Sequence, residues 1–202
     1  MAITEVVFDL GAVLIDWNPR YLYRDIFPDP AMVEWFLATV CHHDWNLAQD
    51  AGRPWAEAEA EAIARHPDHA AAIRAYRQGW GRMLGQPIAG TVALLEALVP
   101  TGIGLTALSN WAADTFEEGR PRMPFLRHFR GITVSGQIGL IKPDPAIFHH
   151  HCERFGITPA AALFIDDNTA NIATAAALGF AVHRFTQPAE LKQCLKDHQL
   201  IP

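Results

Sequence analysis

Cysteine is scarce in this sequence. The 202 residues contain three, Cys41, Cys152 and Cys194, which lie far apart and outside any Cys-x-x-Cys pattern. An odd number of isolated cysteines predicts neither a disulfide framework nor a zinc site. We therefore expect a protein of the reducing cytoplasm.

Long apolar runs and basic clusters are also missing. No segment approaches the roughly 18 apolar residues that a membrane helix needs, and the first residues lead into a strand-like run without a targeting pattern. The 16 Lys and Arg residues are scattered and the net charge is −6, which disfavours a nucleic-acid surface. With 50% hydrophobic and 19% charged residues, the composition is that of a folded globular protein, and small-molecule partners fit it best.

The segment around Asp9 carries the first functional signal. Val6, Val7 and Phe8 form an apolar run without polar alternation, which predicts a strand buried on both faces of a parallel sheet. Asp9 follows at the carboxyl end of this strand, where open α/β sheets bind ligands, and Gly11 permits a tight turn. Asp9 is therefore a candidate nucleophile. The alternative is an Asp that only caps a strand-to-loop turn.

Residues 17–87 have helical spacing almost throughout and form no convincing strand. The expected helices span 21–27, 30–40, 54–65 and 68–84. Strands and helices alternate afterwards, which predicts a doubly wound parallel α/β sheet. The expected organisation is a Rossmann-like core of residues 1–16 and 88–202 with a small all-helical insertion, 17–87, after strand one. Short connections containing Pro or Gly, at 17–18 and 85–87, predict hinges.

Four predicted strand ends or helix starts carry polar side chains. In chain order they are Asp9, Ser109-Asn110, Lys142 and Asp166-Asp167. Because parallel strands place their carboxyl ends at one edge of the sheet, we expect these groups to converge. Three crowded carboxylates would raise one another's pKa, so a divalent cation is expected among them. The alternative for Asp166-Asp167 alone is a helix N-cap and its neighbour.

These residues sit in four motifs with a characteristic order. The motifs are Phe8-Asp9-Leu10-Gly11-Ala12-Val13, Leu108-Ser109-Asn110, Lys142-Pro143 and Phe164-Ile165-Asp166-Asp167-Asn168. They resemble the signature motifs of the haloacid dehalogenase-like (HAD) hydrolase superfamily, over residues 5 to about 185. The insertion is similar to the small helical cap of subclass I. The Asp-Leu-Gly start and the Asp-Asp-Asn ending most resemble phosphatases of the α-D-glucose-1-phosphate type.

The resemblance implies a Mg²⁺-dependent phosphatase that hydrolyses a small phosphomonoester, a sugar phosphate in particular. It implies that Asp9 is the nucleophile and forms an aspartyl-phosphate. It also implies that Asp9, the main-chain carbonyl of Gly11 and Asp166 hold Mg²⁺, with Asp167 helping through the water shell. Splitting hydrolysis through a covalent intermediate replaces one difficult step with two easier ones.

The same resemblance assigns phosphate binding to three other residues. Ser109 and the backbone of Asn110 would bind phosphate oxygens, and Lys142 would pair with the nucleophile and the transferring group. Phosphoryl transfer needs positioning and charge neutralisation more than covalent work from the protein, which agrees with these residue types.

Gly11 departs from the family pattern, in which most phosphatases carry a second Asp two residues after the nucleophile as general acid and base. Such help is worth about 10²–10⁴-fold in rate. One explanation is a leaving group that tolerates weak protonation, such as an anomeric sugar oxygen. Another is a substitute donor, with Asp16, His42 and His43 as candidates. The alternative for the two histidines is an exposed helix end.

Other polar residues carry weaker expectations. His149, His150 and His151 are consecutive on a predicted helix, so they cannot together bind one metal and are expected at the surface. By position, the face of the insertion toward the substrate is expected to include Trp45, Asn46 and Gln49.

Two other functions stay open. A metal-free 2-haloacid dehalogenase would also use Asp9 as its nucleophile, although the pair Asp166-Asp167 disfavours it. A non-catalytic member that binds phosphorylated ligands would have lost turnover together with the second Asp of the first motif.

Overall fold

A five-stranded parallel sheet lies at the centre of the structure, a computed structural model that describes residues 2–202. The strand order is β5-β4-β1-β6-β7, and every neighbouring pair is parallel. The strands are β1 Glu5–Phe8, β4 Gly104–Ser109, β5 Gly131–Val134, β6 Ala162–Asp166 and β7 Ala181–Arg184. The central position of β1 explains its apolar run, because both of its faces are covered.

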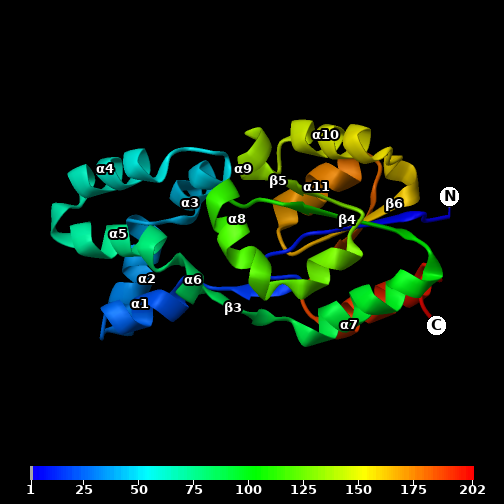
Figure 1. Ribbon diagram of the computed structural model, residues 1–202, viewed down its shortest axis with the longest axis horizontal. Coiled ribbons are helices and arrows are strands. Elements are labelled where there is room, and N and C mark those ends of the chain that lie inside the picture. Colours follow the sequence, from blue (N-terminus) through cyan, green and yellow to red (C-terminus); the bar gives the residue numbers. More distant parts are fainter. Residues whose placement is uncertain (1) are drawn as a thin grey trace.

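Helices cover both faces of this sheet. Val6 and Phe8 belong to the same apolar cluster as the buried leucines of α7 (Ala89–Leu98) and α12 (Pro188–Asp197). Val7, on the other face, packs with α10 (Pro145–Phe155) and α11 (Thr169–Ala177). In Figure 1, α10 and α11 lie above the sheet and α7 lies below it. The expected doubly wound α/β architecture is confirmed.

The insertion is helical and lies at the end of the molecule away from both termini (Figure 1). Its helices are α1 Arg20–Ile26, α2 Pro30–Thr39, α3 His43–Asp50, α4 Trp55–Arg65, α5 Ala70–Gln78 and α6 Trp80–Met83. Two short antiparallel strands, β2 (Ile15–Trp17) and β3 (Leu84–Pro87), connect it to the sheet domain. The sequence predicted neither strand, because three or four residues that include Gly85 and Pro87 carry no strand pattern.

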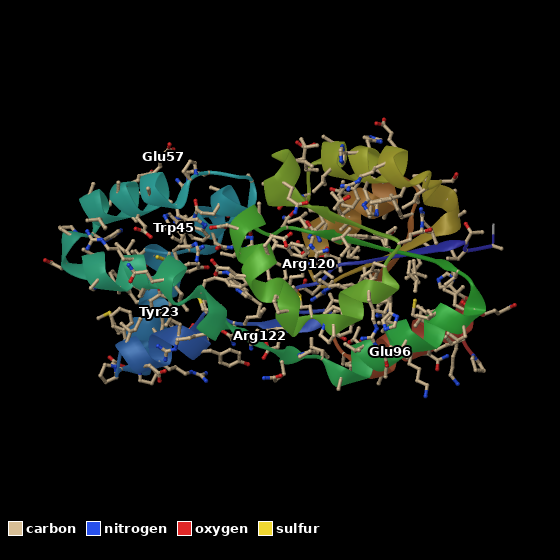
Figure 2. The ribbon with its side chains drawn as sticks, viewed as in Figure 1. Tyr23, Trp45, Glu57, Glu96, Arg120 and Arg122 are labelled. Carbon is tan, nitrogen blue, oxygen red and sulfur yellow. The ribbon has the colours of Figure 1, made fainter. Side chains whose placement is uncertain are left out.

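Aromatic side chains form the centre of the insertion. The rings of Tyr23 and Phe36 are 4.8 Å apart, and those of Trp45 and Tyr76 are 5.0 Å apart. All four residues are buried, and Figure 2 shows Tyr23 and Trp45 among the insertion helices. Burying rings of this size contributes a few kcal/mol each, roughly, to folding.

The remaining elements are short. They are α8 Ala113–Gly119 and α9 Ser135–Ile138, with 3₁₀ turns at Pro67–His69, Val99–Thr101, Arg120–Arg122, Pro124–His128 and Pro159–Ala161. Among residues 2–202, no helix combines the length and the apolar character needed to cross a bilayer.

The expectation that the three consecutive histidines are surface residues is wrong for His151. Its side chain is buried against the sheet, with Nδ1 2.8 Å from the hydroxyl of Thr133 and Nε2 3.1 Å from that of Thr106. Successive helix positions differ by about 100°, so one of three neighbours turns toward the core while His149 stays exposed.

Candidate active site

Lys142 joins the ends of two strands. Its Nζ lies 2.9 Å from Oδ1 of Asp9, just after β1, and 2.6 Å from Oδ2 of Asp166, the last residue of β6. It also donates a hydrogen bond of 2.9 Å to the carbonyl of Leu108 in β4. All of these residues are buried, so the ion pairs are held in a low dielectric. The structure brings together the strand-end groups that the sequence predicted to converge.

Three carboxylates meet beside Lys142. Asp9, Asp166 and Asp167 each offer an oxygen, and these oxygens lie within 4.8 Å of one another. Asn171 fixes Asp166 further by donating from Nδ2 to both carboxylate oxygens, at 3.1 and 3.0 Å. Clustered carboxylate oxygens are the hard donors that Mg²⁺ prefers.

One lysine does not balance three carboxylates. Burial raises the pKa of Asp9 to about 7, with Lys142 opposing the rise and Asp166 adding to it. Burial and the charge of Asp166 also raise the pKa of Asp167. Burial alone would lower the pKa of Lys142, but Asp166 and Asp9 raise it. The cluster therefore favours additional positive charge, and its donor set fits a divalent cation.

An open cavity of about 260 Å³ lies over this cluster. Both the sheet domain and the insertion contribute to its wall. The lining residues that bear on the chemistry are Asp9, Gly11, Ser109, Asn110, Lys142 and Asp167 from the sheet domain, and His43, Asn46, Asp50 and Trp80 from the insertion. A ligand of the carboxylate cluster would therefore contact α3 and α6 as well.

The three expected substitute proton donors occupy different places. Only His43 is among the cavity residues. Nδ1 of His42 instead accepts a hydrogen bond of 3.3 Å from the backbone N–H of Trp45 and caps α3. Asp16 accepts a hydrogen bond from the hydroxyl of Tyr21 and lines a separate hollow beside β3.

Only part of the expected substrate face of the insertion lies at the cavity. Asn46 lines the cavity, whereas Trp45 and Gln49 are buried within the insertion. Asp50 also lines the cavity, and sequence reasoning missed it. The available signal was its spacing of four residues from Asn46, which places both on one helix face, but the short polar segment 43–50 was not predicted to be a helix.

The fold and this site agree with a family model. The model of the haloacid dehalogenase-like hydrolases matches residues 6–179, and the chain belongs to this family. It is thus an enzyme of the hydrolase class, and phosphatases are among its relatives.

Individual relatives differ in their activities. Sesquiterpene phosphatase astK of Aspergillus oryzae is 25% identical over 206 residues, covering 96% of this chain and 95% of that protein. (S)-2-haloacid dehalogenase 1 of a Pseudomonas species is 31% identical over 113 residues, covering 54% of this chain and 49% of that protein. A HAD family enzyme of Bacteroides thetaiotaomicron, solved with magnesium and inorganic phosphate, shares the fold with a TM-score of 0.66 at 21% identity, covering 92% of this chain and 95% of that one.

Proposed function

We propose that this enzyme is a Mg²⁺-dependent phosphatase that hydrolyses a small phosphomonoester through an aspartyl-phosphate on Asp9. The observation that carries the proposal is the position of the buried Lys142 between Asp9 and Asp166, with Asp167 beside them at an open cavity. A carboxylate nucleophile, a fixed cation and a surplus of acidic oxygens suit phosphoryl transfer, in which charge neutralisation is the main task.

Asp9 attacks phosphorus in this proposal, and the alcohol leaves. Lys142 holds the attacking carboxylate in place and balances charge on the phosphoryl oxygens. The hydroxyl of Ser109 and the backbone N–H of Asn110 bind further phosphoryl oxygens. Their location at the end of β4, in the cavity wall, supports this role.

The acidic side of the site would hold the metal. Asp9, the carbonyl of Gly11 and Asp166 are the proposed Mg²⁺ ligands, with Asp167 acting through the water shell. When bound, Mg²⁺ supplies positive charge that polarises the phosphoryl group. The magnesium and phosphate complex of the Bacteroides relative is consistent with such a site.

A sugar phosphate is the proposed substrate class. Trp17, Trp80 and Trp111 give the cavity apolar wall against which a sugar ring can pack, while Asn46 and His43 offer hydrogen bonds for hydroxyls. The volume of about 260 Å³ is at the small end for ligand sites, which favours a small molecule.

The insertion, residues 17–87, acts as a cap in this proposal, over a core of residues 1–16 and 88–202. Its contribution to the cavity wall and its attachment through β2 and β3 support a lid that excludes water. Residues 17–18 and 85–87 are the proposed hinges.

A second candidate is the metal-free dehalogenase, which the Pseudomonas relative favours. The carboxylates of Asp166 and Asp167 weigh against it, because without a cation they would repel a carboxylate substrate. A third is a non-catalytic binder of phosphorylated ligands.

Hydrolysis of p-nitrophenyl phosphate with Mg²⁺ tests the proposal. The wild type should turn over, Asp9→Asn should not, and a chelator should abolish activity that added Mg²⁺ restores. Halide release from a 2-haloacid in the presence of chelator would favour the dehalogenase, and no turnover of any phosphate ester would favour the binder. A panel of sugar and alkyl phosphates then ranks substrates.

A further inference from the structure

The nucleophile has no proton donor on its own loop. Position 11 is Gly, and a Cβ built there would meet no heavy atom within 4 Å, so this part of the cavity is open. An alkoxide leaving group needs a proton as the P–O bond breaks, and the attacking water must lose one in the second step. A group elsewhere in the cavity wall has to serve both steps.

Five ionisable residues of the described chain line the cavity, and two of them are candidates for this group. The five are Asp9, His43, Asp50, Lys142 and Asp167. Three of them, Asp9, Lys142 and Asp167, belong to the nucleophile and cation cluster. Of the other two, His43 is exposed at the first position of α3, whereas Asp50 is fixed in place at the last position of that helix.

Asp50 is held by groups from both sides of the cavity. Oδ1 accepts a hydrogen bond of 3.0 Å from the backbone N–H of Ala112, just after β4. Oδ2 accepts one of 3.1 Å from Nδ2 of Asn46, whose Oδ1 in turn accepts from the hydroxyl of Tyr76 at 3.0 Å. Tyr76 thus sets the orientation of the Asn46 amide. Because Oδ2 accepts only the bond from Asn46 among residues 2–202, it keeps one lone pair that can carry a proton.

The main chain of Asp50 is also attached to the sheet domain. Its carbonyl accepts a hydrogen bond of 2.6 Å from the hydroxyl of Ser135, which follows β5. Although Asp50 belongs to the insertion, these contacts place it next to the loop that follows Ser109 at the end of β4. A proton donor there shares the cavity wall with Asp9, Ser109 and Lys142.

The surroundings of Asp50 favour its protonated form. As the last residue of α3 it lies at the negative end of the helix dipole, which disfavours a carboxylate. Burial raises its pKa to about 7, with the Ala112 hydrogen bond opposing the rise and the charge of Asp9 adding to it. Tyr76 from α5 connects to Asp50 through Asn46, and His43 from the same helix lines the cavity together with Asp9, Lys142 and Asp167. A group of this pKa can give and take a proton near neutrality.

We propose that Asp50 is the general acid and base of this active site, in place of the side chain that Gly11 lacks. The role rests on the phosphatase function proposed above. In the first step Asp9 forms a bond to phosphorus, the ester P–O bond breaks, and the Asp50 proton goes to the departing oxygen, giving the alcohol. In the second step water attacks phosphorus, its proton goes to the Asp50 carboxylate, and the Asp9–phosphorus bond breaks to release hydrogen phosphate.

The test is pre-steady-state kinetics of Asp50→Asn with two substrates. The p-nitrophenolate of p-nitrophenyl phosphate leaves without protonation, so the variant should release one equivalent per active site in a burst and then turn over about 10²–10⁴-fold more slowly. With glucose 6-phosphate, whose leaving group is an ordinary primary alkoxide, the first step itself needs the acid, and no burst should appear. Hydroxylamine should trap the accumulated aspartyl-phosphate in the first case only.

Control variants separate this role from a structural one. Asp44→Asn makes the same chemical change at an exposed position of α3 and should leave both substrates unaffected. Asp50→Glu restores a carboxyl group and should recover part of the lost turnover. Gly11→Asp in the Asp50→Asn background places a carboxyl in the open space beside the nucleophile and should recover turnover of glucose 6-phosphate.

Three results would overturn the role of Asp50. The first is that Asp50→Asn turns over both substrates at the wild-type rate. The second is that it slows both substrates equally and shows no burst, which is the result expected if the substitution only distorts the structure. The third is the burst pattern in His43→Gln with Asp50→Asn unaffected. If the wild type itself hydrolyses no phosphomonoester, the proposed phosphatase function fails and this role fails with it.

Discussion

Asn110 and Lys142 are joined by a reciprocal pair of hydrogen bonds. Nδ2 of Asn110 donates to the carbonyl of Lys142 at 2.8 Å, and the backbone N–H of Lys142 donates to Oδ1 of Asn110 at 2.8 Å. The pair links the loop after β4 to the loop before α10. Because both polar groups of the amide are used, only Asn fits without loss at this position.

Asn110→Ala should displace Lys142 and slow the enzyme. Two buried backbone groups of Lys142 lose their partners, which should cost about 1–3 kcal/mol in the free energy of unfolding measured with urea. Small misplacement of a charged group at a reacting centre costs about 10²-fold in rate, so kcat should fall more than KM rises. Asn110→Asp keeps the acceptor and loses the donor, so its kcat and its free energy of unfolding should lie between those of the wild type and Asn110→Ala. Unchanged kcat and unchanged urea midpoint in Asn110→Ala would contradict this role.

Much of the sheet could be predicted because its residues carry strong patterns. β1 and β6 carry the continuous apolar runs 6–8 and 162–165, each followed directly by an aspartate, and both strands are buried on both faces. Their parallel register places Asp9 and Asp166 at one edge, so the cluster followed from topology alone.

The insertion side of the site could not be predicted to the same extent. Helix α3 is short and polar, and its N-cap is the imidazole of His42, an uncommon capping group. Without that helix the sequence gives no reason to pair Asn46 with Asp50, and the burial of Trp45 depends on contacts with α4 and α5. Side-chain direction on such a segment is set by tertiary packing.

Mg²⁺ should change the relative stability of the wild type and Asp167→Asn. Without metal, the substitution removes one of three mutually repelling carboxylates, so its thermal midpoint should equal or exceed that of the wild type. With Mg²⁺ at about 100 times its Kd, the wild type should gain about 2.7 kcal/mol and become the more stable protein. Differential scanning fluorimetry with and without chelator measures both. Asp44→Asn should shift with Mg²⁺ like the wild type, and an equal shift in Asp167→Asn would contradict the proposed site.

Arg122 should stabilise the connection between the insertion and the sheet domain. It donates to the carbonyls of Gly81, Leu84 and Gly85, at 2.7, 2.6 and 2.9 Å, and thus holds the start of β3 (Figure 2). Since Arg122 is an exposed residue, Arg122→Ala should cost only about 1 kcal/mol. Hydrogen exchange should accelerate over residues 81–87, and KM should rise as the proposed hinge loosens.

Arg120 provides the matched control for that variant. It pairs with Glu117 in the preceding turn and is exposed, so Arg120→Ala should change stability by less than about 0.5 kcal/mol. Its exchange over residues 81–87 should equal that of the wild type. Similar exchange in both variants would contradict a specific role for Arg122.

His151 should make the protein less stable in mild acid. Burial lowers its pKa from 6.5 to about 3, and the charges of Arg130 and Arg154 add to the effect. Between those values the unfolded chain binds a proton that the folded protein does not, so this contribution to stability is complete above pH 6.5 and is lost as the pH falls. The slope is about 1.4 kcal/mol per pH unit. His151→Gln can still hydrogen-bond and does not titrate, so its stability should depend less on pH.

The free energy of unfolding has to be compared between variants at each pH, because other ionisable groups stabilise the folded protein as the pH falls. Asp9 and Asp50, each with a pKa raised to about 7, bind protons in the folded state that the unfolded chain has already released, so they favour folding in acid. Subtracting the unfolding free energies of His151→Gln from those of the wild type at pH 7, 6, 5 and 4 removes these common contributions. The wild type should become steadily less stable relative to His151→Gln as the pH falls. His149→Gln, at an exposed position of the same helix, should show no such trend, and a flat difference for His151→Gln would contradict a buried neutral imidazole.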